Sequence, residues 1–358
     1  MNMTHDQGRP VHGGLDNSEL GALGLRPDDV LDFSASINPL GPSLSAVEAA
    51  QKANLSAYPD PECVELREAI GRSVGVESSR ILVGNGSTEL IHLLARSCLS
   101  EQSAAAIFTP TFGEYEAACR LQRVTPVALS PSDNGFRWNV QAAIDFIAET
   151  RPSVVFLCNP NNPTGVYLGE REVTRVARAL RGIGLLVLDE AYVSFVEDRW
   201  DSLHLLNMPN LALLRSMTKD YALTGLRLGY MLASGDVIER VRRFQYSWSV
   251  NAPAQAAGIA ALSDPGHVER GREAVYAGKR FLSDAFASLG LECLPSAANF
   301  LLIRVGQATE LRLALLQRYK ICVRDCTSFG LSEYIRVGIR GMDDNRKLVE
   351  AFKQVLRS

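Results

Sequence analysis

Long hydrophobic runs are missing from this chain of 358 residues. The apolar runs that it has, such as Val154–Cys158 and Leu185–Leu188, are far shorter than the roughly 20 residues that cross a bilayer. The N-terminal stretch MNMTHDQGRPVHGG is polar and lacks the apolar region that a signal peptide needs. We therefore expect a cytoplasmic protein with no membrane partner.

Paired cysteines are also missing. Seven cysteines are few and scattered in a chain of this length, which excludes the disulfide framework of small secreted domains. The closest pair, Cys322 and Cys326, has no matching second pair and no nearby histidine, and the five histidines show no spacing typical of zinc ligands. We interpret the cysteines as structural and expect no metal site.

Neither sign of charge dominates the sequence. The 37 Lys and Arg residues nearly balance the 40 Asp and Glu residues, which leaves a net charge of −3. Such a chain has no overall electrostatic basis for holding nucleic acid. Any anion that it binds must instead be met by a few well-placed cations.

The pattern that is present predicts a soluble α/β protein. Hydrophobic residues make up 46% of the chain and charged residues 22%, as in an ordinary globular protein. Short apolar runs alternate with helical patterns, which predicts a mostly parallel sheet covered by helices on both faces. The predicted strands are Ile81–Val83, Ala104–Phe108, Thr125–Leu129, Val154–Leu157, Leu185–Leu188, Leu211–Leu214 and Tyr230–Ala233, and the predicted helices between them are Ser87–Ser97, Val140–Glu149 and Glu170–Arg181.

After about Val237 the order of predicted helices and strands changes to that of a smaller α/β unit. No repeat or low-complexity linker separates the two parts, so we expect the boundary to fall inside a long helix. We predict an arm over residues 1–45, a large domain over 46–245 and a small domain over 246–358. The later predicted helices are Val237–Tyr246, Ala252–Leu262, Val268–Leu289, Thr309–Tyr319 and Asp343–Leu356, and the later strands are Phe300–Val305, Ile321–Val323 and Tyr334–Ile339.

The first of four chemical motifs is GNGSTE, residues 84–89, between a predicted strand and a predicted helix. Glycines let the backbone approach a ligand closely, and the start of a helix offers free N–H groups that favour an anion. The hydroxyls of Ser87 and Thr88 add further donors. A plain turn with a serine cap has the same pattern, so this motif alone does not establish a site.

Two further motifs follow predicted strands: NPNNPTG at residues 159–165 and DEAY at residues 189–192. Loops after parallel strands are where α/β proteins bind ligands. The prolines stiffen the first loop, so an asparagine on it would be held in one direction. In the second motif, Asp189 and Tyr192 can face a ligand from the sheet. Turn formers and a capping aspartate are the purely structural alternatives.

The fourth motif is SMTK, residues 216–219, followed by GLRLGY, residues 225–230. Hydroxyl groups together with Arg227 suit a phosphate. A partly desolvated lysine next to an arginine has a lowered pKa and can act as a nucleophile. Lys219 fits that description, and a solvated surface lysine is the alternative.

In this order and at these intervals, the four motifs resemble the fold-type-I pyridoxal-phosphate enzymes of the class I/II aminotransferase group. The resemblance covers the chain from about residue 30 to its end. It implies a large domain whose mostly parallel, seven-stranded sheet lies between helices. It also implies a smaller α/β domain formed by the N-terminal arm and the C-terminal part. The implied cofactor is pyridoxal 5'-phosphate.

The resemblance also implies roles for individual residues. Lys219 would form a Schiff base with the cofactor and then move protons at the substrate's Cα. Asp189 would pair with the pyridine nitrogen and keep it protonated. The 3-oxygen of the ring would be bound by Asn162 and Tyr192, and Phe112 would stack on the ring. The cofactor phosphate would be held by the N–H groups of Thr88 and Glu89, the hydroxyls of Ser87, Ser216 and Thr218, and the guanidinium of Arg227.

Other positions match the substrate and subunit contacts of this group. Arg336 matches the clamp for the α-carboxylate. Arg340 follows four residues later, which on a continuous strand would put both arginines on one face. Tyr58 matches the position that reaches the cofactor phosphate of a neighbouring subunit, which implies an obligate homodimer with shared active sites. A plain turn in a monomer is the alternative for this segment.

Three segments narrow the branch: HGG at 12–14, DFSASINPLG at 32–41 and VRDCTSFGL at 323–331. Together they look like L-threonine-O-3-phosphate decarboxylase of the cobalamin pathway, a relative of histidinol-phosphate aminotransferase. The resemblance implies that His12, Arg324 and Arg340 meet a substrate phosphate. Thr224 stands where a proline is expected, and Leu15 where an asparagine is expected.

Decarboxylation and transamination both stay open, with decarboxylation favoured by these segments. Both reactions use the same cofactor-binding residues and differ in which bond to Cα lies perpendicular to the ring. Sequence does not supply that angle.

Three other functions fit the sequence less well. A transcription regulator would need a DNA-binding domain, and the roughly 30 residues before the first match are too few and not basic. A sugar aminotransferase would keep the lysine but gives no reason for Arg336. A structural protein would not need Lys219, Asp189 and Arg227 together.

Overall fold

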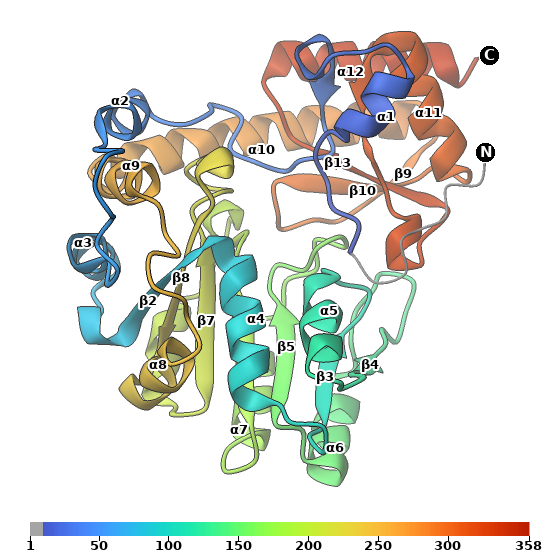
Figure 1. The fold of residues 1–358 in the computed structure, drawn as a ribbon. Helices are drawn as coiled ribbons and strands as arrows, with labels where there is room; N and C mark the ends of the chain where they lie inside the picture. Colours follow the sequence, from blue (N-terminus) through green and yellow to red (C-terminus); the bar gives the residue numbers. More distant parts are fainter. Residues whose placement is uncertain (1–9, 358) are drawn as a thin grey trace.

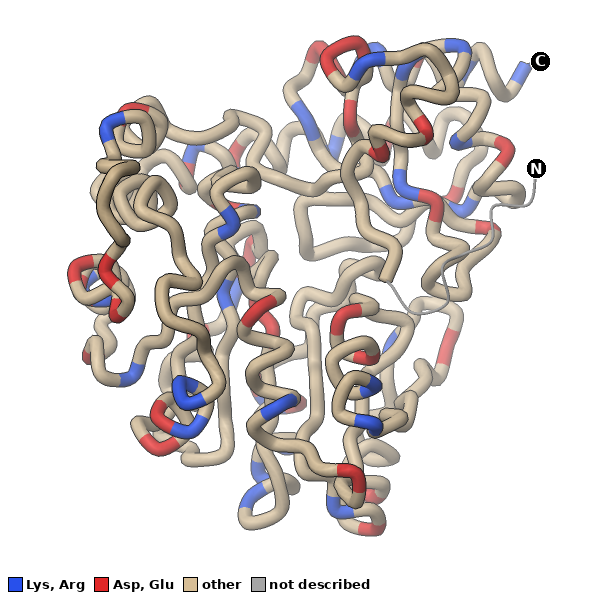
Figure 2. Tube along the Cα trace, in the orientation of Figure 1, with Lys and Arg blue, Asp and Glu red and all other residues tan. Residues whose placement is uncertain are grey.

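The structure, a computed structural model, describes residues 10–357 of the chain. Two α/β units lie next to each other and are connected by the long helix α10 (Pro265–Ser288), as Figure 1 shows. The larger unit contains a seven-stranded sheet, and the smaller unit a four-stranded sheet. Acidic and basic residues are interspersed over both units (Figure 2).

The seven-stranded sheet confirms the predicted mostly parallel architecture. Its strand order is β2-β8-β7-β6-β5-β3-β4, and only β8 runs antiparallel to its neighbours. The chain order of its strands is β2 (Ile81–Asn85), β3 (Ala105–Phe108), β4 (Val127–Leu129), β5 (Val154–Cys158), β6 (Leu185–Asp189), β7 (Leu211–Ser216) and β8 (Leu228–Ala233).

Helices cover both faces of this sheet because both faces of its central strands are apolar. In β5, Val155 and Leu157 belong to one core cluster, whereas Val154 and Phe156 belong to the other. One cluster includes α4 (Gly86–Cys98), α5 (Glu114–Leu121) and α8 (Gly235–Arg242). The other includes α2 (Leu44–Lys52), α3 (Val64–Val74), α6 (Val140–Thr150), α7 (Glu170–Ala179) and α9 (Ala252–Leu262).

The smaller unit is an antiparallel sheet of order β12-β13-β10-β9 packed against helices. The N-terminal segment joins this unit, since β1 (Leu31–Asp32) pairs in parallel with β11 (Ile321–Cys322). The remaining elements are α1 (Asn17–Ala22), β9 (Glu292–Leu294), β10 (Phe300–Arg304), α11 (Ala308–Tyr319), β12 (Arg324–Asp325), β13 (Tyr334–Gly338) and α12 (Met342–Val355).

The sequence analysis missed helices α1, α2, α3 and α5. The predicted strand over 321–323 corresponds to β11 alone, and β12, which follows Val323, belongs to a different sheet. The boundary at residue 245 stays a prediction. Helix α9, which follows it, shares its core cluster with the seven-stranded sheet through Ala254 and Ala257.

Within residues 10–357, no helix is long and apolar enough to cross a membrane. The same residues contain no group of three or more His, Cys, Asp or Glu side chains placed to hold a metal ion. All seven cysteines are free thiols, and none of them is exposed. Cys322 and Cys326 are both buried, in agreement with a structural interpretation.

Asn38 lies where the N-terminal segment, helix α10 and the loop after β7 meet. Its backbone N–H donates to the carbonyl of Lys219 at 2.8 Å, and its side-chain amide donates to the carbonyl of Asp220 at 2.8 Å. A Cβ on Gly271 of α10 would lie 2.2 Å from the Asn38 amide nitrogen. Only glycine therefore lets the helix approach this buried amide.

We predict that Gly271→Ala lowers the free energy of unfolding by about 1–3 kcal/mol, because the new methyl group overlaps an amide that is fixed by two hydrogen bonds. Gly266→Ala in the first turn of the same helix is the matched control. Its Cβ would lie 2.8 Å from the end of the exposed Arg270 side chain and 3.5 Å from Asp264 Oδ1, and the arginine can give way, so little change is expected. Denaturant midpoints of the two variants measure the difference, and equal midpoints would contradict the prediction.

Candidate active site

The candidate site lies at the carboxyl ends of β5, β6 and β7, where the four motifs of the sequence meet. Asp189 is the last residue of β6, Ser216 the last residue of β7, and the NPNNPTG loop follows β5. Ligands of α/β proteins bind at this edge because loops diverge there and leave a crevice. The topology thus brings the predicted motifs to one edge of one sheet.

Asp189 is a buried carboxyl group, with only 3% of the residue exposed. The Tyr115 hydroxyl donates to Oδ2 at 2.7 Å, and the Ala191 N–H donates to Oδ1 at 3.0 Å. Burial raises the pKa of Asp189 to about 6, against the effect of these hydrogen bonds. A cation placed against this carboxyl group would stabilise its ionised form.

Lys219 follows β7, and its Nζ lies 5.9 Å from the centre of the Tyr192 ring. Burial, together with the positive charges of Arg336 and Arg227, lowers the pKa of Lys219 to about 8, against the opposing effect of Asp189. Near neutral pH a sizeable share of this amine is therefore unprotonated, which is the form that attacks an electrophile.

The start of α4 lies close against the β7–β8 connection, and we name this place the cradle. A Cβ on Gly229 would lie 2.5 Å from the backbone nitrogen of Ser87, and a Cβ on Gly86 would lie 3.0 Å from the Arg227 guanidinium. These glycines bring the hydroxyl and N–H groups of α4 against the strand that carries Ser216, the register partner of Gly229.

The other predicted donors agree with this cradle. Ser216 Oγ and Thr218 Oγ1 lie 2.6 Å apart. The carboxylate of Glu89 accepts from the Asn85 N–H at 2.6 Å, so this side chain is engaged within its own loop. Thr224, which stands in place of an expected proline, donates its hydroxyl to the Thr218 carbonyl at 3.2 Å.

Of the three asparagines in NPNNPTG, two support the loop and one faces the site. Asn159 bonds both backbone groups of Leu168, at 2.7 and 3.1 Å. Asn161 accepts from the Thr111 hydroxyl at 2.7 Å and donates to the Pro110 carbonyl at 2.9 Å. Asn162 instead accepts from Arg336.

Two aromatic side chains predicted for the ring pocket lie at the same edge of the sheet. Tyr192 is buried beside Phe300, with the ring centres 5.2 Å apart, and burial raises the pKa of its hydroxyl to about 12. Phe112 is half-buried between the rings of His12 and Tyr115, at 5.4 and 5.8 Å.

Arg336 joins the two units at the site. It is 4% exposed on β13 of the smaller sheet, yet it donates to Asn162 of the larger unit and to the Ser34 carbonyl, the latter at 2.7 Å. Its guanidinium lies 5.1 Å from the centre of the Phe300 ring. An anion bound here would meet a cation that is already fixed in place.

Arg324 and Arg340 lie in different surroundings, and their contact with a substrate phosphate stays a prediction. Arg324 is 6% exposed, pairs in register with Arg336, and donates to the Val11 carbonyl at 2.7 Å. Burial, followed by the nearby charge of Arg336, lowers its pKa to about 10. The expectation that Arg340 shares a strand face with Arg336 is wrong, because β13 ends at Gly338. Arg340 instead donates to Asp344 at 3.0 Å and to the Asp32 carbonyl at 3.1 Å.

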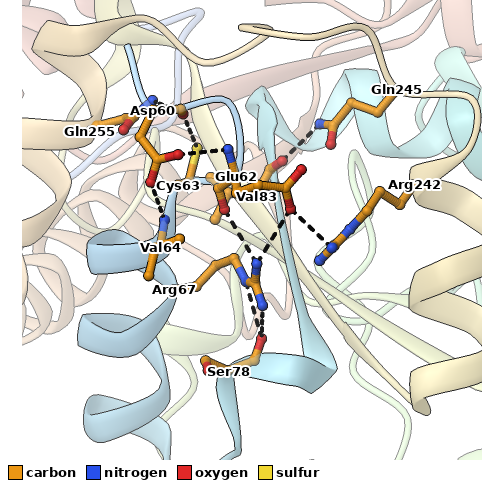
Figure 3. Close-up of polar contacts among 10 residues, drawn as sticks. All are labelled: Asp60, Glu62, Cys63, Val64, Arg67, Ser78, Val83, Arg242, Gln245 and Gln255. Carbon is orange, nitrogen blue, oxygen red and sulfur yellow. Dashed lines mark hydrogen bonds and ion pairs between the residues drawn. The ribbon is translucent and has the colours of Figure 1, made fainter.

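Tyr58 lies apart from these residues on the protein surface. It is 81% exposed, and its ring stacks on Trp248 with the centres 4.7 Å apart. The turn that follows it is held firmly, as Figure 3 shows: Asp60 accepts from the Val64 N–H at 2.7 Å, and Glu62 pairs with Arg242 at 2.9 Å.

Three contributors were missed in the sequence analysis: Tyr115, Glu114 and the backbone carbonyl of Ser34. Tyr115 could have been noticed, since it lies three residues after Phe112 at the start of a helix. The carboxylate of Glu114 is within 2.6 Å of His12 Nε2, 102 positions away in the chain. No local sequence pattern predicts a contact between residues so far apart in the chain.

We predict that acylation of Lys219 in the cofactor-free protein rises with pH, with a midpoint near 8, because only the neutral amine reacts. Arg336→Gln removes a nearby positive charge, so the lysine pKa rises and the midpoint moves to higher pH. Peptide mass spectrometry after brief acylation measures the profile. Lys279, whose pKa is lowered by burial elsewhere, is the internal reference and should not shift. An unmoved Lys219 midpoint would contradict the electrostatic account.

Comparison with known proteins agrees with this geometry. Residues 28–352 match the family model described as aminotransferase class I and II. A histidinol-phosphate aminotransferase of Moorella thermoacetica is 35% identical over 341 residues, which are 93% of this chain and 87% of that protein.

Two solved structures have the same fold. Histidinol-phosphate aminotransferase of Sinorhizobium meliloti, in complex with pyridoxal-5'-phosphate, superposes with a TM-score of 0.88 at 23% identity, over 96% of this chain and 95% of that one. L-threonine-O-3-phosphate decarboxylase of Porphyromonas gingivalis gives a TM-score of 0.80 at 28% identity, over 92% of this chain and 100% of that one. Because the family model matches most of its length, this chain belongs to the class I and II aminotransferases.

Proposed function

We propose that the protein is a pyridoxal-phosphate-dependent aminotransferase of the histidinol-phosphate type, acting on a small phosphorylated amine. The observation that carries this proposal is the buried Lys219 amine, whose pKa is set by burial and by the surrounding Arg336, Arg227 and Asp189. The relative from Moorella thermoacetica supports the choice of substrate. The sequence analysis favoured decarboxylation, and the curated relatives favour its alternative.

The residues present fit pyridoxal 5'-phosphate. The cradle at Gly86 and Gly229 is too tight for any side chain, which leaves backbone N–H groups and Arg227 for a phosphate. The carboxyl group of Asp189, raised in pKa by burial, suits the protonated nitrogen of a pyridine ring. Asn162 and Tyr192 offer polar groups for the ring oxygen, and Phe112 offers a ring face.

When bound, the cofactor supplies an aldehyde that bonds amines and a ring that accepts electrons from Cα. Lys219 holds the reactive amine and then takes or returns the proton at Cα. Arg336 binds an anion next to the reacting carbon, whether a carboxylate or a phosphate ester, and so fixes the substrate's orientation. Arg324, buried next to it, adds a second positive charge on the same side.

Decarboxylation of L-threonine O-3-phosphate is the second candidate. Two observations favour it: the 28% identity to the Porphyromonas gingivalis decarboxylase, and the position of the His12-Gly13-Gly14 segment beside Phe112 and Arg336. Both candidate substrates carry an amine and a phosphate ester, so binding alone does not separate them.

We predict that the holoenzyme transfers the amino group of L-histidinol phosphate to 2-oxoglutarate, measured as glutamate formed. The parallel reaction contains L-threonine O-3-phosphate without any keto acid and is assayed for CO2. Sustained CO2 release without transamination would establish the decarboxylase instead. Lys219→Ala is the negative control for both reactions, and turnover by that variant would overturn the whole proposal.

The proposed enzyme is a homodimer in which Tyr58 serves the site of the other subunit. Tyr58 is largely exposed, and its ring stacks on Trp248. Other large apolar side chains are exposed in the segments around it, including Leu44 and Leu55. The turn is braced by Glu62 and Arg242, so its position is defined without a partner (Figure 3).

We predict that mixing Tyr58→Ala subunits with Lys219→Ala subunits restores about one quarter of the wild-type activity, since half of the dimers then hold one intact site of two. Sedimentation of the wild-type protein should give the mass of two chains. If the mixture is no more active than the two variants measured separately, Tyr58 does not act across an interface.

A further inference from the structure

A short N-terminal segment, which we name the strap (residues 10–14), crosses from one unit to the other at the candidate site. On the larger unit, Pro10 packs against Gly113, where a Cβ would lie 3.1 Å from it. On the smaller unit, the Val11 carbonyl accepts from Arg324 at 2.7 Å.

The glycines of the strap also lie against the residues that meet the substrate. Gly14 donates its N–H to the Ser34 hydroxyl at 2.8 Å. A Cβ on Gly13 would lie 2.4 Å from the Ser34 carbonyl and 3.0 Å from Nη2 of Arg336. The strap therefore passes directly over the anion-binding arginine.

One carboxylate fixes the side chain of the strap. Glu114, the first residue of α5, is 7% exposed and sits between two imidazoles. Its Oε1 lies 2.6 Å from Nε2 of His12, and its Oε2 lies 2.7 Å from Nε2 of His92. Hydrogen bonds from His12 and then His92 hold the pKa of Glu114 at about 2, so the group is an anion under all working conditions.

A carboxylate only accepts hydrogen bonds, so both imidazoles must carry a proton on Nε2. Nδ1 of His12 takes no part in this pair. In the neutral ring, Nδ1 is an acceptor, whereas in the imidazolium it becomes a donor to an anion. A donor role toward a phosphate therefore requires the imidazolium, with Glu114 at one ring nitrogen and the phosphate at the other.

Several charged or titratable groups come from the elements near Glu114. The strap contributes His12, and α4 contributes His92. Glu89, one turn earlier on α4, directs its carboxylate to the Asn85 N–H. Arg324 of the smaller unit is engaged by the Val11 carbonyl and by the Ser328 hydroxyl, at 2.7 and 2.6 Å.

We propose that Glu114 is a positioning residue that sets the preference for phosphorylated substrates: it anchors the strap over the site and holds His12 as a hydrogen-bond donor for the substrate's phosphate. The inference rests on the proposed function, since it requires a substrate with a phosphate group. Glu114 itself touches neither the cofactor nor the substrate and acts through His12.

The first test is Glu114→Gln in the holoenzyme, assayed with L-histidinol phosphate and with glutamate as separate amino donors. KM for the phosphate ester should rise about tenfold, which corresponds to about 1.4 kcal/mol. The value of kcat, and KM for glutamate, should stay within about twofold. Glu116→Gln is the matched control: it makes the same change two residues further along α5 and removes an exposed ion pair with Arg120.

A double variant separates positioning from general stability. In a His12→Gln background, Glu114→Gln should add nothing to the rise in KM, because its effect passes through the imidazole. An additional tenfold rise in the double variant would overturn the proposal, as would a Glu114→Gln enzyme with unchanged KM.

A second readout needs no substrate. Hydrogen exchange at the Gly14 amide should be faster in Glu114→Gln than in the wild type or in Glu116→Gln, since the strap loses its anchor. If the wild-type enzyme does not use either phosphorylated substrate, the proposed function fails, and exchange at Gly14 still tests the anchor. If turnover is as proposed but exchange does not change, the anchor is refuted while the proposed function stands.

Discussion

The site depends on one buried arginine that belongs to the smaller unit but is bonded to the larger one. Arg336 reaches from the middle of an antiparallel sheet to Asn162 on the loop after β5, and to the carbonyl of Ser34 in the N-terminal segment. One guanidinium therefore connects strand β13, the loop after β5 and the N-terminal segment. An anion bound at Arg336 would therefore meet a guanidinium that is already fixed in place.

The same burial acts in opposite directions on the two ionisable groups at the centre of the site. It raises the pKa of Asp189 and lowers the pKa of Lys219, which brings both values closer to neutrality. Groups with pKa values this close to neutrality can gain or lose a proton at working pH, as catalytic acids and bases must. A cationic ring bound against Asp189 would return that carboxyl group to its ionised form. A pyridinium therefore supplies the positive charge that favours the carboxylate form of Asp189.

The sequence was informative wherever chemistry and local pattern coincide. The strands of the large sheet were predicted because both of their faces are apolar, and the motifs were placed at one edge because they follow those strands. Arg340 was misplaced because β13 ends two residues before it, where Asp344 and the Asp32 carbonyl bind its side chain. Tyr115 was overlooked because a buried tyrosine resembles core. The pair of His12 and Glu114 could not be predicted, since only the folded chain brings a polar arm residue to a helix start.

The pairing of β1 with β11 also bears on how the protein is made. The partner of Leu31 in this parallel pair is Ile321, near the other end of the chain. At ordinary ribosomal rates of about 5–20 residues per second, the N-terminal segment waits roughly 15–60 s before its partner strand has been synthesised. Its apolar residues, including Leu20 and Val30, stay without their packing partners Leu316 and Cys322 during this delay. The larger sheet, complete by residue 233, can form during that interval without it.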